Sequence, residues 1–306
     1  MDVFLTHVHM YKDSIQYKKS ENNKLKRALY NFRLFGSPYV WYQLSRIGLL
    51  GFLENMQGTF FSGKKMVLPA GDMGTSVFSM YGILPHKSER RLTLWIMKNL
   101  EDSAVFYDIG AHMGYYTALS EKILTSGEVH AFEANGKLCK YLNRNFSNSK
   151  NVHIVCAAIT DSPGEVDFYD AIRDQDSSAS SRFLLSDQYN SVPSKVAAIT
   201  IDEYIRKENR PPTVMKLDIE GGEYDAILGA LDTLRENSPS IIMEIWSSEK
   251  GRKYSDKAVK KLQELGYEAF LIKSDGSAGE ESVRDPVGTV SGRGHDTRDN
   301  FLFLKK

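Results

Sequence analysis

The stretch DIGAHMG combines an acid, Asp108, with two glycines four positions apart, Gly110 and Gly114. Glycines at such positions let the backbone turn tightly and let a ligand approach the start of the next helix. A dinucleotide-binding turn would need the spacing G-x-G-x-x-G, which is absent, and an acid before the glycines would repel a pyrophosphate. Asp108 suits a cationic ligand that carries an amino acid.

Glu133 lies 23 residues after Gly110, at the end of the next apolar run. An acid at this place can bind both hydroxyl groups of a ribose. The alternative is an exposed acid at a strand end. Because the glycine turn precedes it, Glu133 favours an adenosine-type ligand without a phosphate clamp. No Walker lysine motif occurs, so hydrolysis of ATP or GTP is disfavoured.

A second polar cluster, KLDIEGGE, follows another apolar run. Alternation along a strand would place Lys216, Asp218 and Glu220 on one side of it. Glu244 interrupts the apolar run SIIMEIW in the same way, and would meet Asp218 at a neighbouring strand end. Buried charges need a partner, a ligand or solvent. A structural ion pair of Lys216 with a carboxylate and a functional role of these residues both stay open.

The histidines give weaker signals. His130 and His153 lie inside apolar runs, and we expect them to be core or sheet residues rather than catalysts. His112 lies in the glycine turn, and His295, before the last apolar run, is better placed to reach a cleft. The spacing of His and Cys fits no zinc site, and no G-x-S-x-G motif supports a hydrolase triad.

Short apolar runs alternate with helical patterns from about residue 75 onward. Nearly continuous apolar strands joined by helices are typical of a parallel sheet covered on both faces, here a doubly wound α/β fold. The expected strands are 104–109, 128–133, 152–158, 213–219, 240–246, 267–272 and 300–306, and the expected helices are 115–124, 137–145, 223–235 and 255–265.

Residues 1–70 differ in character, because a basic stretch and an aromatic-rich segment replace the strand–helix alternation. We expect a mainly helical or irregular extension there, followed by one domain over residues 71–306. Within this domain, strand-like runs at 166–170 and 196–200 bracket a Ser/Asp-rich segment, 171–194. A surface insertion and a lid or binding loop are equally good interpretations of that segment.

The composition limits the function classes. The 306 residues carry 39 Lys and Arg against 39 Asp and Glu, which argues against a dedicated nucleic-acid binder. No apolar run approaches about 18 residues, so no membrane span is expected. The first residues, MDVFLTHVHMYKD, lack the pattern of a secretory signal, and two cysteines provide no disulfide framework. We expect a soluble cytoplasmic protein.

Several stretches, taken in order, resemble the FkbM family of S-adenosylmethionine-dependent methyltransferases. They are YDIGAHMGYYTALS, VHAFEANGK, AAITDSPGEVDFYD, TIDEY, VMKLDIEGGEYDAILGAL, IIMEIW, LGYEAF and NFLFL, between about residues 103 and 304. The resemblance implies a class I methyltransferase fold, which is Rossmann-like, with a seven-stranded, mostly parallel sheet in the order 3-2-1-4-5-7-6. His112 stands where the family generally has Asn, and Ala134-Asn135 replaces its usual Pro-Asn.

The resemblance also implies S-adenosyl-L-methionine as the cofactor. Asp108, Gly110 and Gly114 would line its methionine end, Glu133 would hold its ribose, and the turn 156–158 would lie against its adenine. The expected cofactor-binding residues are Asp108, Gly110, Ala111, Met113, Gly114, Thr117, Glu133, Ala134, Asn135, Ala157, Ala158 and Asp218.

We expect methyl transfer to a hydroxyl group of a sugar, polyketide or other acceptor in natural-product biosynthesis. Such a hydroxyl must lose its proton during attack. Asp218 is the first candidate for the base, followed by Glu220 and Glu244, with Lys216 orienting the acids and His295 as an outside candidate. No metal ligand is assigned, although a divalent ion between Asp218 and Glu244 is left open.

Two other functions are weighed. One is methylation of an amide or amine nitrogen in a peptide or small molecule. The other is a non-catalytic cofactor-binding or scaffold module. The presence of Asp108, Glu133, Asp218 and Glu220 argues against it, because a scaffold has no physical need for these acids. A third alternative, an NAD dehydrogenase, is excluded because the G-x-G-x-x-G pattern of a dinucleotide-binding turn is absent. The acceptor, which we expect to be a small molecule, glycan or natural product, is not readable from the sequence, and homo-oligomer formation is left open.

Overall fold

The computed structural model describes residues 1–4, 6, 8, 55–69, 73–84, 86–169, 194–292 and 298–306. These residues divide into two compact units, one within residues 1–90 and one from residue 91 onward. Three features of the sequence lie outside the described residues: the aromatic segment near residues 32–42, the loop 171–194 except for its last residue, and His295.

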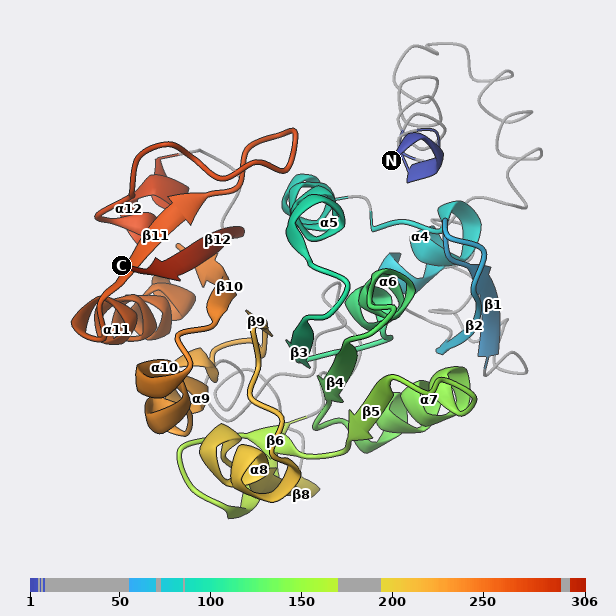
Figure 1. The fold of residues 1–306 in the computed structure, drawn as a ribbon, viewed down its shortest axis with the longest axis horizontal. Helices are drawn as coiled ribbons and strands as arrows, with labels where there is room; N and C mark the ends of the chain where they lie inside the picture. Colours follow the sequence, from blue (N-terminus) through green and yellow to red (C-terminus); the bar gives the residue numbers. More distant parts are fainter. Residues whose placement is uncertain are drawn as a thin grey trace. The chain divides into compact units, whose positions relative to one another are not determined.

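The second unit is built on a seven-stranded sheet (Figure 1). Its strands are β3 (Val105–Ile109), β4 (Glu128–Phe132), β5 (Val152–Val155), β9 (Val214–Leu217), β10 (Ser240–Trp246), β11 (Tyr267–Leu271) and β12 (Arg298–Lys305). The order across the sheet is β11-β12-β10-β9-β3-β4-β5. Strand β12 is antiparallel to β10 and β11, and the other neighbouring pairs are parallel. Counted from β5, this is the order 3-2-1-4-5-7-6, so the predicted fold class is confirmed.

The helices that the structure describes from residue 87 onward are α5 (Lys87–Asn99), α6 (Tyr115–Ile123), α7 (Gly136–Phe146), α8 (Ile201–Glu208), α9 (Glu223–Leu228), α10 (Leu231–Glu236), α11 (Glu249–Glu264) and α12 (Pro286–Ser291). The single helix predicted at 223–235 is interrupted at Gly229. This glycine lies so close to the Thr160 carbonyl that an added Cβ would be 2.0 Å from its oxygen. Among the described helices, none combines the length and apolar character needed to cross a bilayer.

Alternate residues of the central strands point to opposite faces of the sheet. On one face, Tyr107, Met215 and Leu217 belong to a buried cluster that includes side chains of α8 to α12. On the opposite face, Asp108 of β3 and Lys216 of β9 are direct neighbours in register. Both faces of these strands are buried, as nearly continuous apolar runs indicate. Two charged side chains therefore lie inside the sheet core and need partners there.

A separate three-stranded sheet lies outside the main one. It consists of β6 (Ala158–Ile159), β7 (Gly164–Phe168) and β8 (Ser194–Ile199), in the order β6-β8-β7. The sequence predicts strands at these places but not a second sheet. It also predicts one strand over 152–158, whereas the chain leaves the main sheet after Val155 and enters the small sheet at Ala158.

The expectation of a mainly helical or irregular extension does not hold for residues 55–69. Strands β1 (Asn55–Thr59) and β2 (Lys65–Pro69) form an antiparallel hairpin, which α4 (Met73–Tyr81) follows. The turn between them includes Gly63 at a φ of +95°. Met66 and Leu68 alternate as buried residues along β2. This short alternation next to a glycine turn was the signal for the hairpin.

Cys139 and Cys156 form a disulfide, with their Cα atoms 5.8 Å apart. Two cysteines predicted no disulfide framework, and this single bridge was not predicted from the sequence. Helix α7, which carries Cys139, packs beside β5, and Cys156 directly follows that strand. The packing brings together two residues that are 17 positions apart.

We expect Gly110→Ala to destabilise the fold. Gly110 has a φ of +82°, and an added Cβ would lie 1.9 Å from the Asp218 carbonyl oxygen. Backbone strain and overpacking together should lower the free energy of unfolding by about 2 to 4 kcal/mol, measured by urea denaturation.

The matched control is Gly136→Ala at the start of α7, where an added Cβ would meet nothing within 4 Å. This variant should match or slightly exceed the wild-type stability, because alanine favours a helix by up to about 1 kcal/mol over glycine. Equal stability of the two variants would contradict the close approach at Gly110.

Candidate functional site

The residues predicted for the site gather at the carboxyl ends of the central strands. This is the edge of an open α/β sheet at which ligands bind. The loops after β3, β4 and β9 are joined there by backbone hydrogen bonds. Gly110 and Ala111 both donate to the Phe132 carbonyl at 3.0 Å, and Asp218 donates to the Ile109 carbonyl at 3.1 Å. The segments that follow β3 and β9 are therefore each bonded to the last residue of a neighbouring strand.

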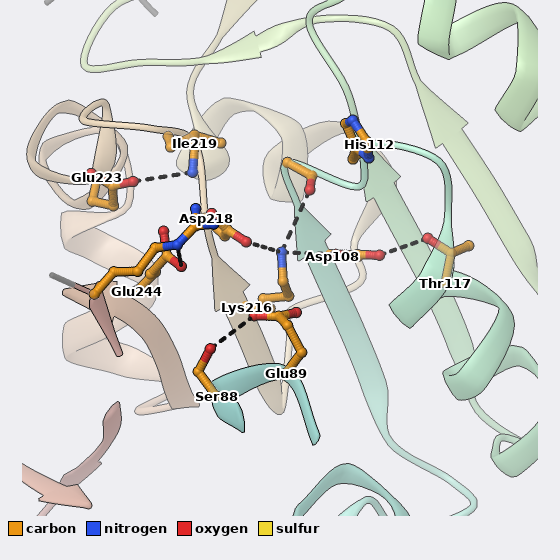
Figure 2. Close-up of polar contacts among 12 residues, drawn as sticks. Ser88, Glu89, Asp108, His112, Thr117, Lys216, Asp218, Ile219, Glu223 and Glu244 are labelled. Atoms are coloured by element: carbon orange, nitrogen blue, oxygen red, sulfur yellow. Dashed lines mark hydrogen bonds and ion pairs between the residues drawn. The ribbon is translucent and has the colours of Figure 1, made fainter. Parts of the chain in front are cut away.

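Lys216 lies at the centre of this region, and its side chain is buried. Its Nζ is 3.2 Å from Asp218 Oδ2 and 3.7 Å from Asp108 Oδ1, and it donates to the Gly110 carbonyl at 3.5 Å. Figure 2 shows the ammonium group between the two carboxylates. The sequence left open a structural ion pair and a functional role for Lys216, and the structure shows the ion pair.

Asp108 lies beneath the glycine loop and is fully buried. Its Oδ2 accepts a hydrogen bond of 2.7 Å from the Thr117 hydroxyl. Burial raises the pKa of Asp108 above its ordinary range, while Lys216 and Thr117 oppose that rise. Asp108 and Thr117, two of the expected cofactor-binding residues, thus join β3 to α6 through this buried hydrogen bond.

Glu133 holds the same loop from the side of β4. Its two oxygens accept hydrogen bonds of 2.8 Å from the backbone N–H groups of His112 and Asn135. Burial raises the pKa of this carboxyl group. His112 has a φ of +52°, in the left-handed region that Asn and His tolerate better than most residues. The exchange of Asn for His at this position is therefore compatible with the turn.

The remaining expected cofactor residues surround these loops. Asn135 caps α7, since its side chain accepts from the Lys137 N–H at 2.9 Å and the Leu138 N–H at 3.4 Å. The others follow the ends of β3, β4 and β5, which are neighbours in the sheet: Ala111, Met113 and Gly114 after β3, Ala134 after β4, and Ala157 and Ala158 after β5. They share one edge of the sheet.

Three acids converge beside this edge. Asp218, Glu220 and Glu244 each offer a carboxylate oxygen within 4.8 Å of the others. The sequence predicted their meeting by strand alternation, but β9 ends at Leu217. Glu220 instead reaches the cluster from a turn in which its φ is +56°. Such a group of oxygens could hold a hard divalent cation or accept a proton.

Glu223 is a positioning residue that the sequence analysis did not single out. It is buried at the start of α9, where Oε1 accepts from the Ile219 N–H at 3.0 Å (Figure 2). Its Oε2 accepts from the Gly221 N–H at 3.0 Å. Burial raises its pKa to about 7, and Asp218 adds to the rise. Glu223 thereby fixes the turn that presents Asp218 and Glu220. In the sequence, the only sign of this role was that Glu223 is the last residue of the polar cluster KLDIEGGE.

Comparisons with known proteins bear on this arrangement. A family model described as the methyltransferase FkbM domain matches residues 108–269, slightly more than half of the chain. No curated protein matches the sequence.

Among solved structures, the methyltransferase FkbM from Methylobacillus flagellatus KT is 15% identical with a TM-score of 0.45, over 76% of this chain and 53% of that one. The chain therefore spans about half the length of that protein. Precorrin-6y C5,15-methyltransferase from Geobacter metallireducens GS-15 is 16% identical with a TM-score of 0.39, over 71% of this chain and 86% of that one. Fibrillarin from Aeropyrum pernix, solved with natively bound S-adenosyl-L-methionine, is 12% identical with a TM-score of 0.40, over 70% of this chain and 74% of that one.

We expect Lys216→Met to lower the free energy of unfolding by about 3 to 5 kcal/mol, the usual cost of removing one partner of a buried ion pair. The change leaves the buried Asp108 carboxylate without its cation. Adding Asp108→Asn removes the stranded charge and should recover about 1 kcal/mol or more in a double-mutant cycle measured by urea denaturation. Strictly additive losses would show that the two groups do not interact.

We expect Glu223 to make the protein less stable as pH rises from about 4.5 to about 7. Its pKa is raised from an ordinary 4.5 to about 7. In this window the folded state holds a proton that the unfolded state has released, so the contribution is present at low pH and is lost as pH rises.

Glu223→Gln removes this titration and should flatten the pH dependence of the unfolding free energy, by on the order of 2 to 3 kcal/mol across the window. Denaturation at a series of pH values measures the slope. Glu236→Gln, a change at the exposed end of α10, is the control and should keep the wild-type slope. A wild-type slope in Glu223→Gln would contradict the assignment.

Proposed function

The chain belongs to the FkbM family of S-adenosylmethionine-dependent methyltransferases, and from this premise we propose that it methylates a hydroxyl group of a sugar, polyketide or other natural product. The observation that carries the proposal is the convergence of Asp218, Glu220 and Glu244 beside the glycine loop. An attacking hydroxyl must lose its proton, and a carboxylate within reach can accept it.

The residues at the sheet edge fit S-adenosyl-L-methionine. Each oxygen of Glu133 accepts one backbone hydrogen bond and keeps a second acceptor site, which suits the two hydroxyl groups of a ribose. The positive φ angles of Gly110 and Gly114 shape a loop that a ligand can approach closely. When bound, the cofactor supplies a methyl group activated on a sulfonium centre. The chain then has to hold the acceptor oxygen in line with that methyl group and exclude water.

Asp218 is the favoured base among the three acids. Its side chain is 25% exposed, compared with 4% for Glu244, so an acceptor reaches Asp218 more easily. Lys216 orients the Asp218 carboxylate through their 3.2 Å contact. Glu244 lies 3.8 Å from Arg298 Nε, a cation that offsets part of the negative charge around Asp218. A non-catalytic module would have no use for this grouping of acids.

We expect Asp218→Asn to reduce turnover by about 10²- to 10⁴-fold, the usual contribution of a positioned base. Binding of S-adenosyl-L-methionine, measured by calorimetry, should stay close to wild type. Turnover is followed by mass spectrometry across a panel of hydroxyl and amine acceptors, as a gain of one methylene. The control is Asp232→Asn, an exposed aspartate of α10.

Unchanged turnover in Asp218→Asn would reject the base role, whereas lost binding would move Asp218 to the cofactor site. A product methylated on nitrogen would replace hydroxyl transfer with amine or amide transfer. Adding EDTA to the wild-type assay decides whether the acids hold a divalent ion, since only a metal-dependent reaction then stops.

A further inference from the structure

We infer that Glu128, His130 and His153 form a binding site for a divalent transition-metal ion of the zinc class. Two imidazoles and one carboxylate are ligands that zinc prefers, and they leave a fourth position for water. Each of the three residues offers one ligand atom within 4.8 Å of the others. The inference does not depend on the proposed methyl transfer.

The sheet itself brings the three residues together. His130 of β4 and His153 of β5 are direct neighbours in register, so their side chains lie on the same face. Glu128 is two residues before His130 on the same strand, and strand alternation gives it that face too. No loop conformation is needed, because adjacent parallel strands set all three positions.

The buried imidazole of His130 points into this cluster. His130 is 2% exposed, and its Nε2 faces Glu128 Oε1 at 3.2 Å. His153 Nε2 is 3.4 Å from the other oxygen of Glu128. An ion bound among the three residues would take the lone pair of this nitrogen and balance the charge of the carboxylate that faces it.

A hydrogen bond on the other ring nitrogen supports the same assignment. His130 Nδ1 lies 2.7 Å from the hydroxyl of Tyr204 in α8. When Nδ1 donates its proton to that oxygen, Nε2 is left as the unprotonated nitrogen. Metal-binding histidines commonly have such a bond, which fixes the ring and its tautomer. Tyr204 is thus a positioning residue for the site.

The surroundings of the cluster allow an ion to enter. The side chain of His153 is 47% exposed, so its ring, now stacked on that of His130 at 4.7 Å, can turn toward a shared ion. Arg210 Nε is 3.0 Å from Glu128 Oε1, but its side chain is 62% exposed. Exposed ion pairs of this kind contribute little stability, so an incoming ion can displace the guanidinium.

The site lies at the amino end of β4, whereas the glycine loop and Glu133 lie at its carboxyl end. Glu133 lies five positions after Glu128. In an extended chain this is a rise of about 16 Å. A metal ion here would join β4 and β5, with α8 attached through Tyr204. It would be separate from the acid cluster of Asp218, Glu220 and Glu244.

The test is a zinc titration of the full chain after treatment with EDTA, by calorimetry. We expect a zinc ion to bind at this site, and His153→Ala to weaken that binding by more than about 10-fold. His153 is at the surface, so its loss should leave the melting temperature without zinc unchanged. Tyr204→Phe should weaken binding by about 10-fold. The controls are His86→Ala, which removes a histidine outside the cluster, and Asp218→Asn, which alters the acid cluster.

Cobalt gives a second readout that is independent of methyl transfer. Cobalt bound by two imidazoles and a carboxylate should absorb in the visible range, and His153→Ala should remove that absorption. The proposal is overturned if the wild type binds no zinc, if His153→Ala and Glu128→Gln both bind zinc as the wild type does, or if only Asp218→Asn loses binding.

Discussion

The buried ammonium group of Lys216 is the constraint on which the candidate site depends. It lies between Asp108 and Asp218 and reaches the Gly110 carbonyl, so one cation links the ends of β3 and β9. Two carboxylates this close inside a sheet would repel each other without it. The cation therefore joins the glycine loop to Asp218, one of the three acids of the cluster.

Two buried glutamates at this edge hold loops in the same way, by accepting hydrogen bonds from backbone N–H groups. Glu133 accepts backbone N–H groups of the loops after β3 and β4, and Glu223 accepts those of the turn after β9. Each carboxylate replaces the regular hydrogen bonds that a loop lacks, and each has a pKa raised by burial. The loops at this edge are therefore held by side chains rather than by further strands.

The main sheet could be predicted because its strands are short apolar runs, and residues 240–246 match β10 at both ends. Lys216, Asp218 and Glu244 could be picked out because a charge in an apolar run needs a partner, a ligand or solvent. The path of Glu220 could not be predicted, because it depends on a left-handed turn after a four-residue strand. The role of Glu223 could not be predicted either. It depends on α9 starting directly after the turn, so that the Glu223 carboxylate reaches the backbone N–H groups of Ile219 and Gly221. The loop 171–194 and His295 stay predictions.

The bridge between Cys139 and Cys156 has a consequence for how the protein is handled. It joins two residues 17 positions apart, and such a ring restricts the denatured chain enough to contribute about 3 kcal/mol. Molecules made with and without a thiol reductant are then different covalent species that differ by two hydrogen atoms. Cytosolic glutathione would favour the open dithiol, and a secretory or periplasmic environment would favour the ring. The redox state of the sample accordingly belongs with its concentration and buffer as a defining property of the molecule.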